Sequence, residues 1–324
     1  MITRAALLMT VLAVAGAVAA EPVRLRFGST WAIDSVPFAV LRRAADATEK
    51  AGGVVVTTLP GHRWADEAEL AAALREGKLE GATLTSEGLA ATFPDLCVFE
   101  APGLSPDQRE TDRVRDALVK KLEPELAKRG LVLLGWGELG AQYVFSTSPV
   151  RTPADFAAAR PIASQRTGVL ASLFGALASE PLTLATPDVG GNLSSGAAGA
   201  VIATPAQVVR LGWFRQLRFV TNVRVSSGAV ATLVRRDAYE RLSTDERAAL
   251  SRAVFRGHRE LTAHARAGTI SALDVLVARG VTVVQPELQP WERLFNQVAE
   301  AASRTVYAPD LLAEVRKGLT LRPK

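Results

Sequence analysis

Residues 131–156 read LVLLGWGELGAQYVFSTSPVRTPADF, and this stretch decides how the chain is organised. Its first part, Leu131 to Trp136, is a short apolar run that predicts a buried strand. Its later part, residues 148–153 (SPVRTP), has the turn-forming residues of a linker and ends in a Thr-Pro pair that is typical of a helix start. The character of the sequence changes near Ser146. We therefore expect one α/β unit to end here and a second one to begin.

Strand and helix patterns alternate before this stretch. Residues 23–27 alternate apolar and basic side chains, which predicts a strand. A helix is expected to start at Asp34 or Ser35 and to stop at Gly52-Gly53. The segments that follow are strands at 54–59 and 82–85, a helix opened by a capping-box pattern at Asp66 and Glu69, and a helix at 111–129. This alternation favours an α/β domain with a largely parallel sheet.

A second α/β unit follows the linker. Its expected elements are an extended segment at 161–164, a helix at 169–177, strands at Leu182 and 200–203, and helices started by Thr186-Pro187 and by Pro205. A strand at 230–234 is expected to return to the first unit. Ser243 and Glu246 then form a capping-box pattern at the start of one long predicted helix. This helix has about 36 residues and is about 54 Å long. Gly257 and Gly268 suggest bends in it.

A helix of this length exceeds one small domain, so we expect it to lie along both units. The predicted division is lobe I at 21–145 plus 223–265, and lobe II at 146–222 plus 266–324 with a C-terminal helical extension. Two lobes joined by more than one crossing strand suggest a cleft that hinges. Clefts between domains are favoured ligand sites.

The composition excludes several classes of protein. The chain has 324 residues, a formal net charge of +5, and acidic and basic residues that are interleaved. A nucleic-acid partner is not expected, because a clustered basic stripe is missing from the sequence. Cys97 is the single cysteine and lies in an apolar run, which favours a small buried hydrophobe.

The first twenty residues have the layout of a secretory signal peptide. A short basic start is followed by an apolar run from Ala5 to Val18, and small residues then allow cleavage near Ala19 or Ala20. The apolar run is shorter than the ~20 residues of a spanning helix. We therefore expect a periplasmic, soluble mature chain.

The order and spacing of these segments resemble the DctP family, the periplasmic solute-binding proteins of TRAP transporters. In that family a strand ending in Trp leads to Glu-x-Gly and then to a "P-V-K-T-P-E-D-L" stretch. The corresponding residues here are Trp136, Glu138, Gly140 and 149–156, with further matches at 182–184 (LTL), 187–189 (PDV), Gly196 and 242–246 (LSTDE). The resemblance implies a fold of two α/β lobes with hinge strands and a long helix that spans both lobes. It also implies capture of a small organic solute and its delivery to TRAP-type membrane subunits.

The chain departs from the family pattern where carboxylate ligands are held. The usual clamp arginine corresponds to Ile162, a second arginine corresponds to Gln142, and a usual aspartate corresponds to Gly199. A planar guanidinium makes carboxylate capture bidentate, and isoleucine cannot replace it. Arg160 or Arg166 can compensate only with a register shift. We therefore expect a divergent branch of the family whose ligand is not a simple dicarboxylate and is larger or more apolar.

Candidate ligand-binding residues follow the predicted strands. Trp31 offers an aromatic surface and Thr85 and Ser86 offer hydroxyls, although a core tryptophan and a helix cap are the alternatives. Glu138 has a structural hydrogen-bonding role as its alternative. The predicted set is Trp31, Thr85, Ser86, Trp136, Glu138, Gln142, Gln165, Arg166 and Thr204.

The sequence lacks the residue patterns that an enzyme mechanism requires. Nucleophilic catalysis needs a nucleophile beside a positioned base, and His62, His258 and His264 show no such pairing in the sequence. His258 and His264 are six residues apart and do not match metal-ligand spacing on a helix. We therefore expect neither catalysis nor a cofactor or metal. The main alternative to a transport function is an exported ligand-sensing or apolar-ligand shuttle protein on the same fold.

Overall fold

The computed structural model describes residues 21–64, 66–104, 108–163 and 168–320. Nine strands in this part of the chain form one mixed sheet in the order β2-β1-β3-β8-β4-β7-β5-β6, and β9 pairs with β8. The strands are β1 (Arg24–Gly28), β2 (Val55–Leu59), β3 (Gly81–Thr85), β4 (Leu131–Ser146), β5 (Pro161–Ala163), β6 (Leu182–Thr183), β7 (Ala200–Ala203), β8 (Phe219–Arg235) and β9 (Thr282–Val284).

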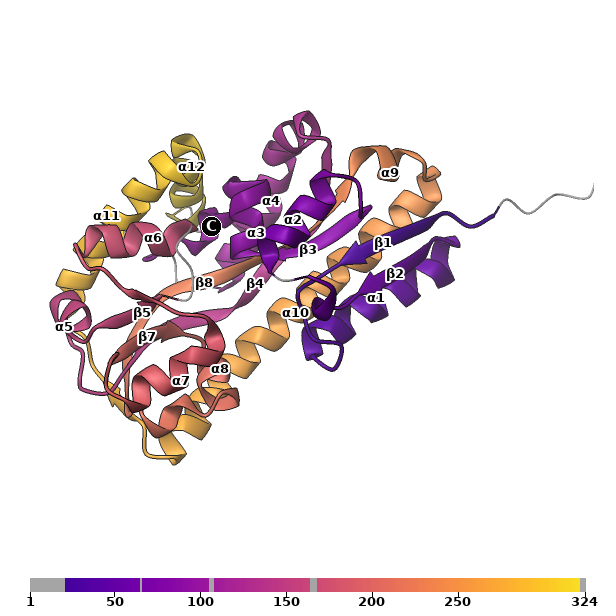
Figure 1. Cartoon of the computed structure of the whole chain (residues 1–324). Coiled ribbons are helices and arrows are strands. Elements are labelled where there is room, and N and C mark those ends of the chain that lie inside the picture. Colours follow the sequence, from indigo (N-terminus) through magenta and orange to yellow (C-terminus); the bar gives the residue numbers. More distant parts are fainter. Residues whose placement is uncertain (1–20, 65, 105–107, 164–167, 321–324) are drawn as a thin grey trace, which may run out of the picture.

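Helices cover both faces of this sheet, as the α/β prediction requires (Figure 1). The α-helices are α1 (Val36–Gly52), α2 (Glu67–Arg75), α3 (Ser86–Thr92), α4 (Gln108–Lys128), α5 (Pro153–Ala158), α6 (Gly168–Ala176), α7 (Thr186–Ser194), α8 (Pro205–Arg210), α9 (Arg236–Glu240), α10 (Thr244–Ala278), α11 (Leu288–Thr305) and α12 (Pro309–Thr320). Three short 3₁₀ helices are η1 (Gly61–Arg63), η2 (Pro94–Glu100) and η3 (Trp213–Arg215).

Strands β4 and β8 form a long antiparallel ribbon. They run side by side from the Leu131–Arg235 pair to the Ser146–Phe219 pair. At about 3.3 Å per residue, such strands are about 50 Å long, which is enough to cross two small lobes. The sequence predicted only 131–136 and 230–234 as strands, so it identified one end of each. The remaining positions contain glycines and polar residues at several shifts of register, which hide the strand pattern.

The other strands form two groups, and each group pairs with one half of this ribbon. β3 pairs with the C-terminal half of β8, and β1 and β2 continue the sheet from there; we call this half lobe I. β7 pairs with the C-terminal half of β4, and β5 and β6 continue in the other direction; we call this half lobe II. The ribbon is therefore the part of the sheet that both lobes share.

The long helix α10 runs along both lobes on one face of the sheet (Figure 1). It packs on α1, on β4 and on α8. Ser243 and Glu246 form the predicted capping box at its start. The helix is continuous through Gly257 and Gly268, where the sequence suggested bends. Gly257 lies where α10 packs on α1, because a Cβ there would make ordinary van der Waals contact with the Cβ of Ala44 at 3.4 Å.

The C-terminal helices contact both lobes. α11 packs on α5 and α6 of lobe II, whereas α12 packs on α4 and η2 of lobe I. The largest apolar core accordingly continues from α2, α3 and α4 to α6, α11 and α12. The lobe boundaries expected from the sequence stay a prediction. In the described part of the chain, no helix is both long and apolar enough to cross a membrane.

Candidate functional site

The carboxyl ends of the parallel strands of both lobes reach the ribbon near its middle. β3 ends at Thr85, opposite Val230, and β7 ends at Ala203, opposite Tyr143. Val230 pairs with Gly137, so the two strand ends are about six ribbon residues, or about 20 Å, apart. We call the ribbon between them, residues 138–142 and 226–229, the junction. Ligands of α/β proteins bind outside the carboxyl ends of strands, which makes the junction the candidate site.

A buried carboxylate fixes β8 at the junction. The Oε1 atom of Glu100 accepts hydrogen bonds from the hydroxyl of Ser86 and, at 2.7 Å, from the backbone N–H of Ala229. The hydroxyl of Ser226 donates to the backbone carbonyl of Glu100 at 2.8 Å. Burial raises the pKa of Glu100 to about 7, although both hydrogen bonds to its side chain act in the opposite direction. No sequence pattern pointed to this residue, which lies in a 3₁₀ helix.

Two of the predicted residues border the junction from lobe I. A Cβ at Gly228 would lie 3.9 Å from the Ser86 hydroxyl and 3.8 Å from the Cβ of Leu139, so these three residues are neighbours. Trp31 and Leu139 pack against one small apolar cluster. Both Ser86 and Trp31 keep part of their surface accessible to solvent. Both residues therefore lie at the lobe I border of the junction, where the Ser86 hydroxyl already donates to Glu100.

Thr85 is held by a buried carboxylate that no sequence pattern indicated. The Glu67 Oε2 atom accepts a 3.0 Å hydrogen bond from the backbone N–H of Thr85, and its Oε1 atom accepts one of 2.5 Å from the Thr30 hydroxyl. Burial raises the pKa of Glu67. This side chain joins the ends of β1 and β3 to the start of α2, so it positions the lobe I loops that surround the junction. The pattern at 66–69 indicated only a helix cap.

Gln142 and Thr204 lie on the lobe II side. Gln142 is opposite Ser226 on the ribbon and is partly exposed. Thr204 directly follows β7 and caps α8, because its hydroxyl accepts a 3.2 Å hydrogen bond from the N–H of Gln207. Thr204 therefore has a local structural role in addition to any contact with a ligand. Gln165 and Arg166 lie outside the described residues.

In lobe II, the two positions where the family resemblance implies a charged residue are occupied by Ile162 and Gly199. Ile162 is 1% exposed and packs in the core that includes Val189 and Val208, so its side chain points away from solvent. Gly199 has no room for an aspartate, because a Cβ there would lie 2.6 Å from the carbonyl oxygen of Ala159. Arg160 donates to the carbonyl of Gly196. The described residues of lobe II thus place no guanidinium where the clamp is expected.

Trp136 is engaged in the lobe I core. It is 5% exposed, its indole N–H donates to the carbonyl of Leu96 at 3.1 Å, and its ring packs edge-on against Phe99 at 5.2 Å. The sequence placed this tryptophan correctly at the end of an apolar run. These are packing contacts within lobe I, and the expected ligand contact of Trp136 stays a prediction.

Glu138 is the centre of a buried charge cluster. Its Oε1 atom accepts a 2.7 Å hydrogen bond from Arg266, and Arg115 and Arg224 lie 3.5 Å from its Oε2 atom. Arg266 also forms two 2.8 Å hydrogen bonds to Asp112. The cluster therefore joins α4, β4, β8 and α10. These contacts support the structural alternative for Glu138 that the sequence left open.

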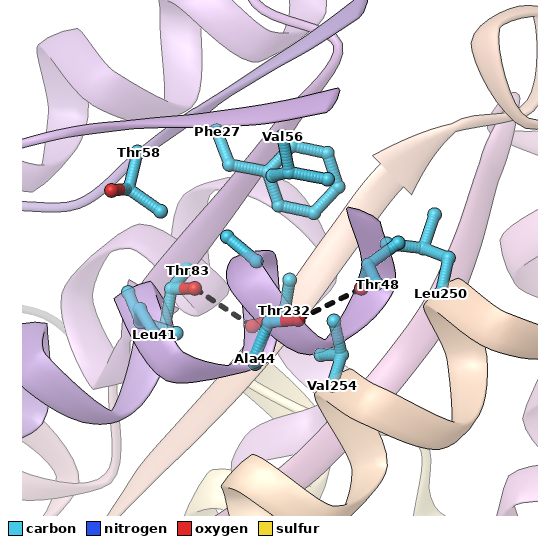
Figure 2. A pocket seen from close by; sticks show the side chains of 11 residues that line it. Phe27, Leu41, Ala44, Thr48, Val56, Thr58, Thr83, Thr232, Leu250 and Val254 are labelled. Carbon is cyan, nitrogen blue, oxygen red and sulfur yellow. Dashed lines mark hydrogen bonds between the residues drawn. The ribbon is translucent and has the colours of Figure 1, made fainter. Parts of the chain in front are cut away.

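A small cavity lies between the lobe I sheet and helices α1 and α10 (Figure 2). Its volume is about 20 Å³, which is room for water and not for an organic solute. Thr83 and Thr232 on its wall share a 2.7 Å hydrogen bond, and Thr232 lies 2.8 Å from the Nε2 atom of His258. Burial lowers the pKa of His258 to about 3, so this imidazole is neutral. The cavity is a packing feature of lobe I.

The described residues contain no cluster of three or more His, Cys, Asp or Glu side chains that is arranged to hold a metal ion. Cys97 lies within η2 and is fully buried, and its thiol faces the carbonyl of Ser86 at 3.6 Å. Burial, followed by the nearby Glu100 and Asp95 carboxylates, raises the pKa of this thiol well above its usual value. The arrangement favours an unreactive side chain.

A protein-family model matches most of the chain. The family described as DctP, bacterial extracellular solute-binding protein, family 7, matches residues 27–305. No curated protein sequence matches the chain.

Solved structures show the same fold at low sequence identity. A receptor from Bordetella pertussis that binds pyroglutamic acid is 18% identical, with a TM-score of 0.78 over 92% of this chain and 99% of that one. A TRAP periplasmic protein from Xanthobacter autotrophicus with bound β-D-galacturonate is 17% identical, with a TM-score of 0.78 and coverage of 92% and 100%. One from Desulfovibrio salexigens with bound orotic acid is 16% identical, with a TM-score of 0.78 and coverage of 91% and 98%.

Proposed function

The chain belongs to the DctP family of bacterial extracellular solute-binding proteins, and we propose that it closes its two lobes around a small organic solute at the junction. The family is one of solute receptors and not of enzymes. We further propose that the loaded chain delivers this solute to TRAP-type membrane subunits. The observation that carries the proposal is the shared ribbon, on which the strand ends of both lobes face the junction from opposite sides.

The ribbon supports closure for a mechanical reason. The two ribbon strands pass between the lobes beside α10 and the C-terminal helices, and shifts of register interrupt their pairing between Glu138 and Ala141 and again after Gln142. A small rotation at such irregular positions moves one lobe against the other. A solute that contacts both lobes then stabilises the closed arrangement, because the open one offers it fewer contacts.

The described residues support a solute other than a simple dicarboxylate. The three structural relatives bind pyroglutamic acid, β-D-galacturonate and orotic acid, which are small polar acids. In this chain, however, Ile162 is buried and Gln142 supplies an amide where a second guanidinium is usual. We propose Trp31, Thr85, Ser86, Gln142 and Thr204 as ligand contacts. The assignments of Gln165 and Arg166 stay predictions.

We also propose that the chain is exported. Its family is extracellular, and the first twenty residues have the pattern of a signal peptide with cleavage near Ala19 or Ala20. Those residues lie outside the described part of the structure. The N-terminal sequence of the chain purified from the cell envelope tests this proposal. An intact Met1 contradicts it.

Native mass spectrometry tests the proposed function. The chain from Glu21 to Lys324 is purified without refolding and is then denatured to release any bound molecule. We expect one small organic molecule per chain, and we expect Gln142→Ala to reduce its retention. Gln108→Ala, an exposed glutamine at the start of α4, is the matched control and should retain the molecule fully. Failure of the unfolded and refolded wild-type chain to rebind any component of a cell extract contradicts the proposal.

A further inference from the structure

Two hydroxyls at the carboxyl edge of the lobe I strands share one arrangement. Thr30 lies just after β1, and Ser86 begins α3 directly after β3. β1 and β3 are parallel neighbours, so both hydroxyls lie at the same edge of the sheet. Both side chains keep part of their surface accessible to solvent. Behind each lies a buried carboxylate, Glu67 for Thr30 and Glu100 for Ser86.

The carboxylates fix the direction of these hydrogen bonds. Both oxygens of Glu67 accept a hydrogen bond, one of them from Thr30. The Oε1 atom of Glu100 accepts from Ser86 and from the N–H of Ala229, and at pH 8 this side chain is ionised because its pKa is about 7. A hydroxyl has one proton and two lone pairs, and an ionised carboxylate can only accept. The hydroxyls of Thr30 and Ser86 therefore offer lone pairs alone to a solute.

The charge behind these hydroxyls is negative. The partners of Glu67 and Glu100 are hydroxyls and backbone N–H groups, and no ion pair among the described residues includes either side chain. Glu87, the residue after Ser86, is a third carboxylate that is only partly exposed, and burial followed by the nearby Asp66 raises its pKa. Charges interact more strongly where water is scarce. This edge of lobe I therefore attracts a positively charged donor and repels a carboxylate.

The lobe II side of the junction has the opposite hydrogen-bond polarity. The hydroxyl of Thr204 accepts a 3.2 Å hydrogen bond from the N–H of Gln207, so its own proton is not used in that bond. Gln142 has an amide group that carries two further donors and is partly exposed. These two side chains can donate to an oxygen atom of a solute. The lobes thus differ in the kind of group that each can hold.

We propose that the solute turns a hydrogen-bond donor, best an ammonium group, to Thr30 and Ser86 and an acceptor oxygen to Thr204 and Gln142. The inference rests on the proposed function and adds the chemical class and the orientation of the ligand to it. The class is a small molecule with an amine at one end and a carbonyl or carboxyl oxygen at the other. A dicarboxylate places an acceptor oxygen against the lone pairs of lobe I, with buried negative charge behind them.

Three probes with a chain of four carbons test this class. Succinate, 4-hydroxybutyrate and 4-aminobutyrate share a carboxylate at one end and carry a carboxylate, a hydroxyl or an ammonium group at the other. The mature chain is emptied by unfolding and refolding, and isothermal titration at pH 8 measures each dissociation constant. Hydrogen bonds that involve a charged group are the strong ones. We expect 4-aminobutyrate to bind at least tenfold more tightly than succinate, with 4-hydroxybutyrate between them.

Two variants assign this preference to the lobe I edge. Ser86→Ala removes the accepting hydroxyl, and we expect it to weaken 4-aminobutyrate about tenfold while succinate binds no more weakly than before. Glu100→Gln keeps an oxygen that accepts from Ser86 but removes the charge, and we expect it to reduce the preference over succinate at least threefold. Glu49→Gln is the matched control, because Glu49 is an exposed glutamate near the opposite end of α1. It should keep the full preference, and circular dichroism should show all three variants folded.

Three results overturn the inference. The first is succinate binding as tightly as 4-aminobutyrate, and the second is a preference in Ser86→Ala that equals that of the wild type. The third is the absence of binding by all three probes at about 10 mM. Failure of the proposed function is read separately, from a wild-type chain that retains and rebinds no solute in mass spectrometry. A chain that rebinds its own solute but fails with the probes keeps the proposed function and loses only the assigned class.

Discussion

The Oε1 atom of Glu138 on β4 accepts a 2.7 Å hydrogen bond from the Nε atom of Arg266 on α10. The Glu138 side chain is 4% exposed, and Arg115 and Arg224 approach its other oxygen. This contact ties the ribbon to the long helix at the point where the ribbon passes from one lobe to the other. The same residue begins the Glu-x-Gly motif, so the motif lies on the ribbon at the junction.

Replacing Glu138 should destabilise the whole protein. Glu138→Gln removes the buried carboxylate that Arg266, Arg115 and Arg224 share and leaves Arg115 with Asp112 alone, and breaking a buried pair in this way typically costs about 3–5 kcal/mol. Urea unfolding measures the loss. The exposed Arg43–Glu260 pair is the control, since both side chains are more than half exposed, and Glu260→Gln should cost less than about 1 kcal/mol. If Glu138→Gln is as stable as the wild type yet retains no solute, Glu138 is a ligand contact instead.

As the pH falls, Glu100 should increase the stability of the fold and His258 should decrease it. The pKa of Glu100 is raised from 4.5 to about 7, so the folded state takes up a proton between these values that the unfolded state does not. This uptake stabilises the fold as the pH falls from 7 to 4.5. The pKa of His258 is lowered from 6.5 to about 3, so the unfolded state alone is protonated between pH 6.5 and 3. That group destabilises the fold as the pH falls.

Single variants separate these two contributions. Between pH 6.5 and 4.5 they offset each other in the wild type, at about 1.4 kcal/mol per pH unit for each proton. Relative to the wild type, Glu100→Gln should therefore lose stability as the pH falls through this window, whereas His258→Gln should gain it. Chemical unfolding at pH 6.5, 5.5 and 4.5 gives the two differences. If the stability difference from the wild type changes with pH in the same direction for both variants, the opposite pKa shifts of Glu100 and His258 are contradicted.

The backbone at Gly140 requires glycine. Its φ of 101° lies in a region that side chains rarely adopt, and a Cβ there would lie 3.0 Å from the Thr269 hydroxyl on α10. Gly140→Ala should cost about 1–3 kcal/mol of unfolding free energy. Gly191→Ala, on a helix with open space around its Cβ, is the control and should be neutral or stabilising by up to about 1 kcal/mol. Equal stability of the two variants would contradict the positive φ of Gly140 and its close approach to Thr269.

The thiol of Cys97 should be inert until the chain unfolds. It is fully buried, and burial raises its pKa well above the usual value, so almost no thiolate is present at neutral pH. A chromogenic disulfide reagent should leave the native chain unmodified and should react with one thiol per chain in 6 M guanidinium. Rapid modification of the native chain would instead show that η2 opens and exposes the thiol in the folded state.

The sequence predicted the local elements well because their signals are local. Ser35 caps α1, Gly53 ends it in a left-handed conformation, and Ser243 opens α10, all as the residues indicated. The sequence did not show that β4 and β8 continue into the second lobe. Their partners lie about 90 residues away along the chain, and glycines and shifts of register interrupt the alternation of side chains.

The candidate site was only partly predictable for the same reason. The Glu-x-Gly motif placed Glu138 near the junction, but its partners Arg115 and Arg266 arrive from helices that are 23 and 128 residues away. Glu67 and Glu100 showed no signal, because each looks like an ordinary acidic residue near a helix end. Ile162 and Gln142 were informative as departures from a family pattern.

The distance between the lobes, with and without solute, tests the central claim most directly. Cys97 is buried, so spin labels attach selectively at Asp34→Cys before α1 and at Asp188→Cys on α7, two exposed positions on opposite lobes. Electron–electron double resonance measures their separation in the mature chain, first empty and then saturated with the solute recovered from the purified protein. We predict a broad distribution of distances that becomes narrower and shifts to a shorter mean on saturation. An unchanged distribution at saturation contradicts closure of the lobes around the solute.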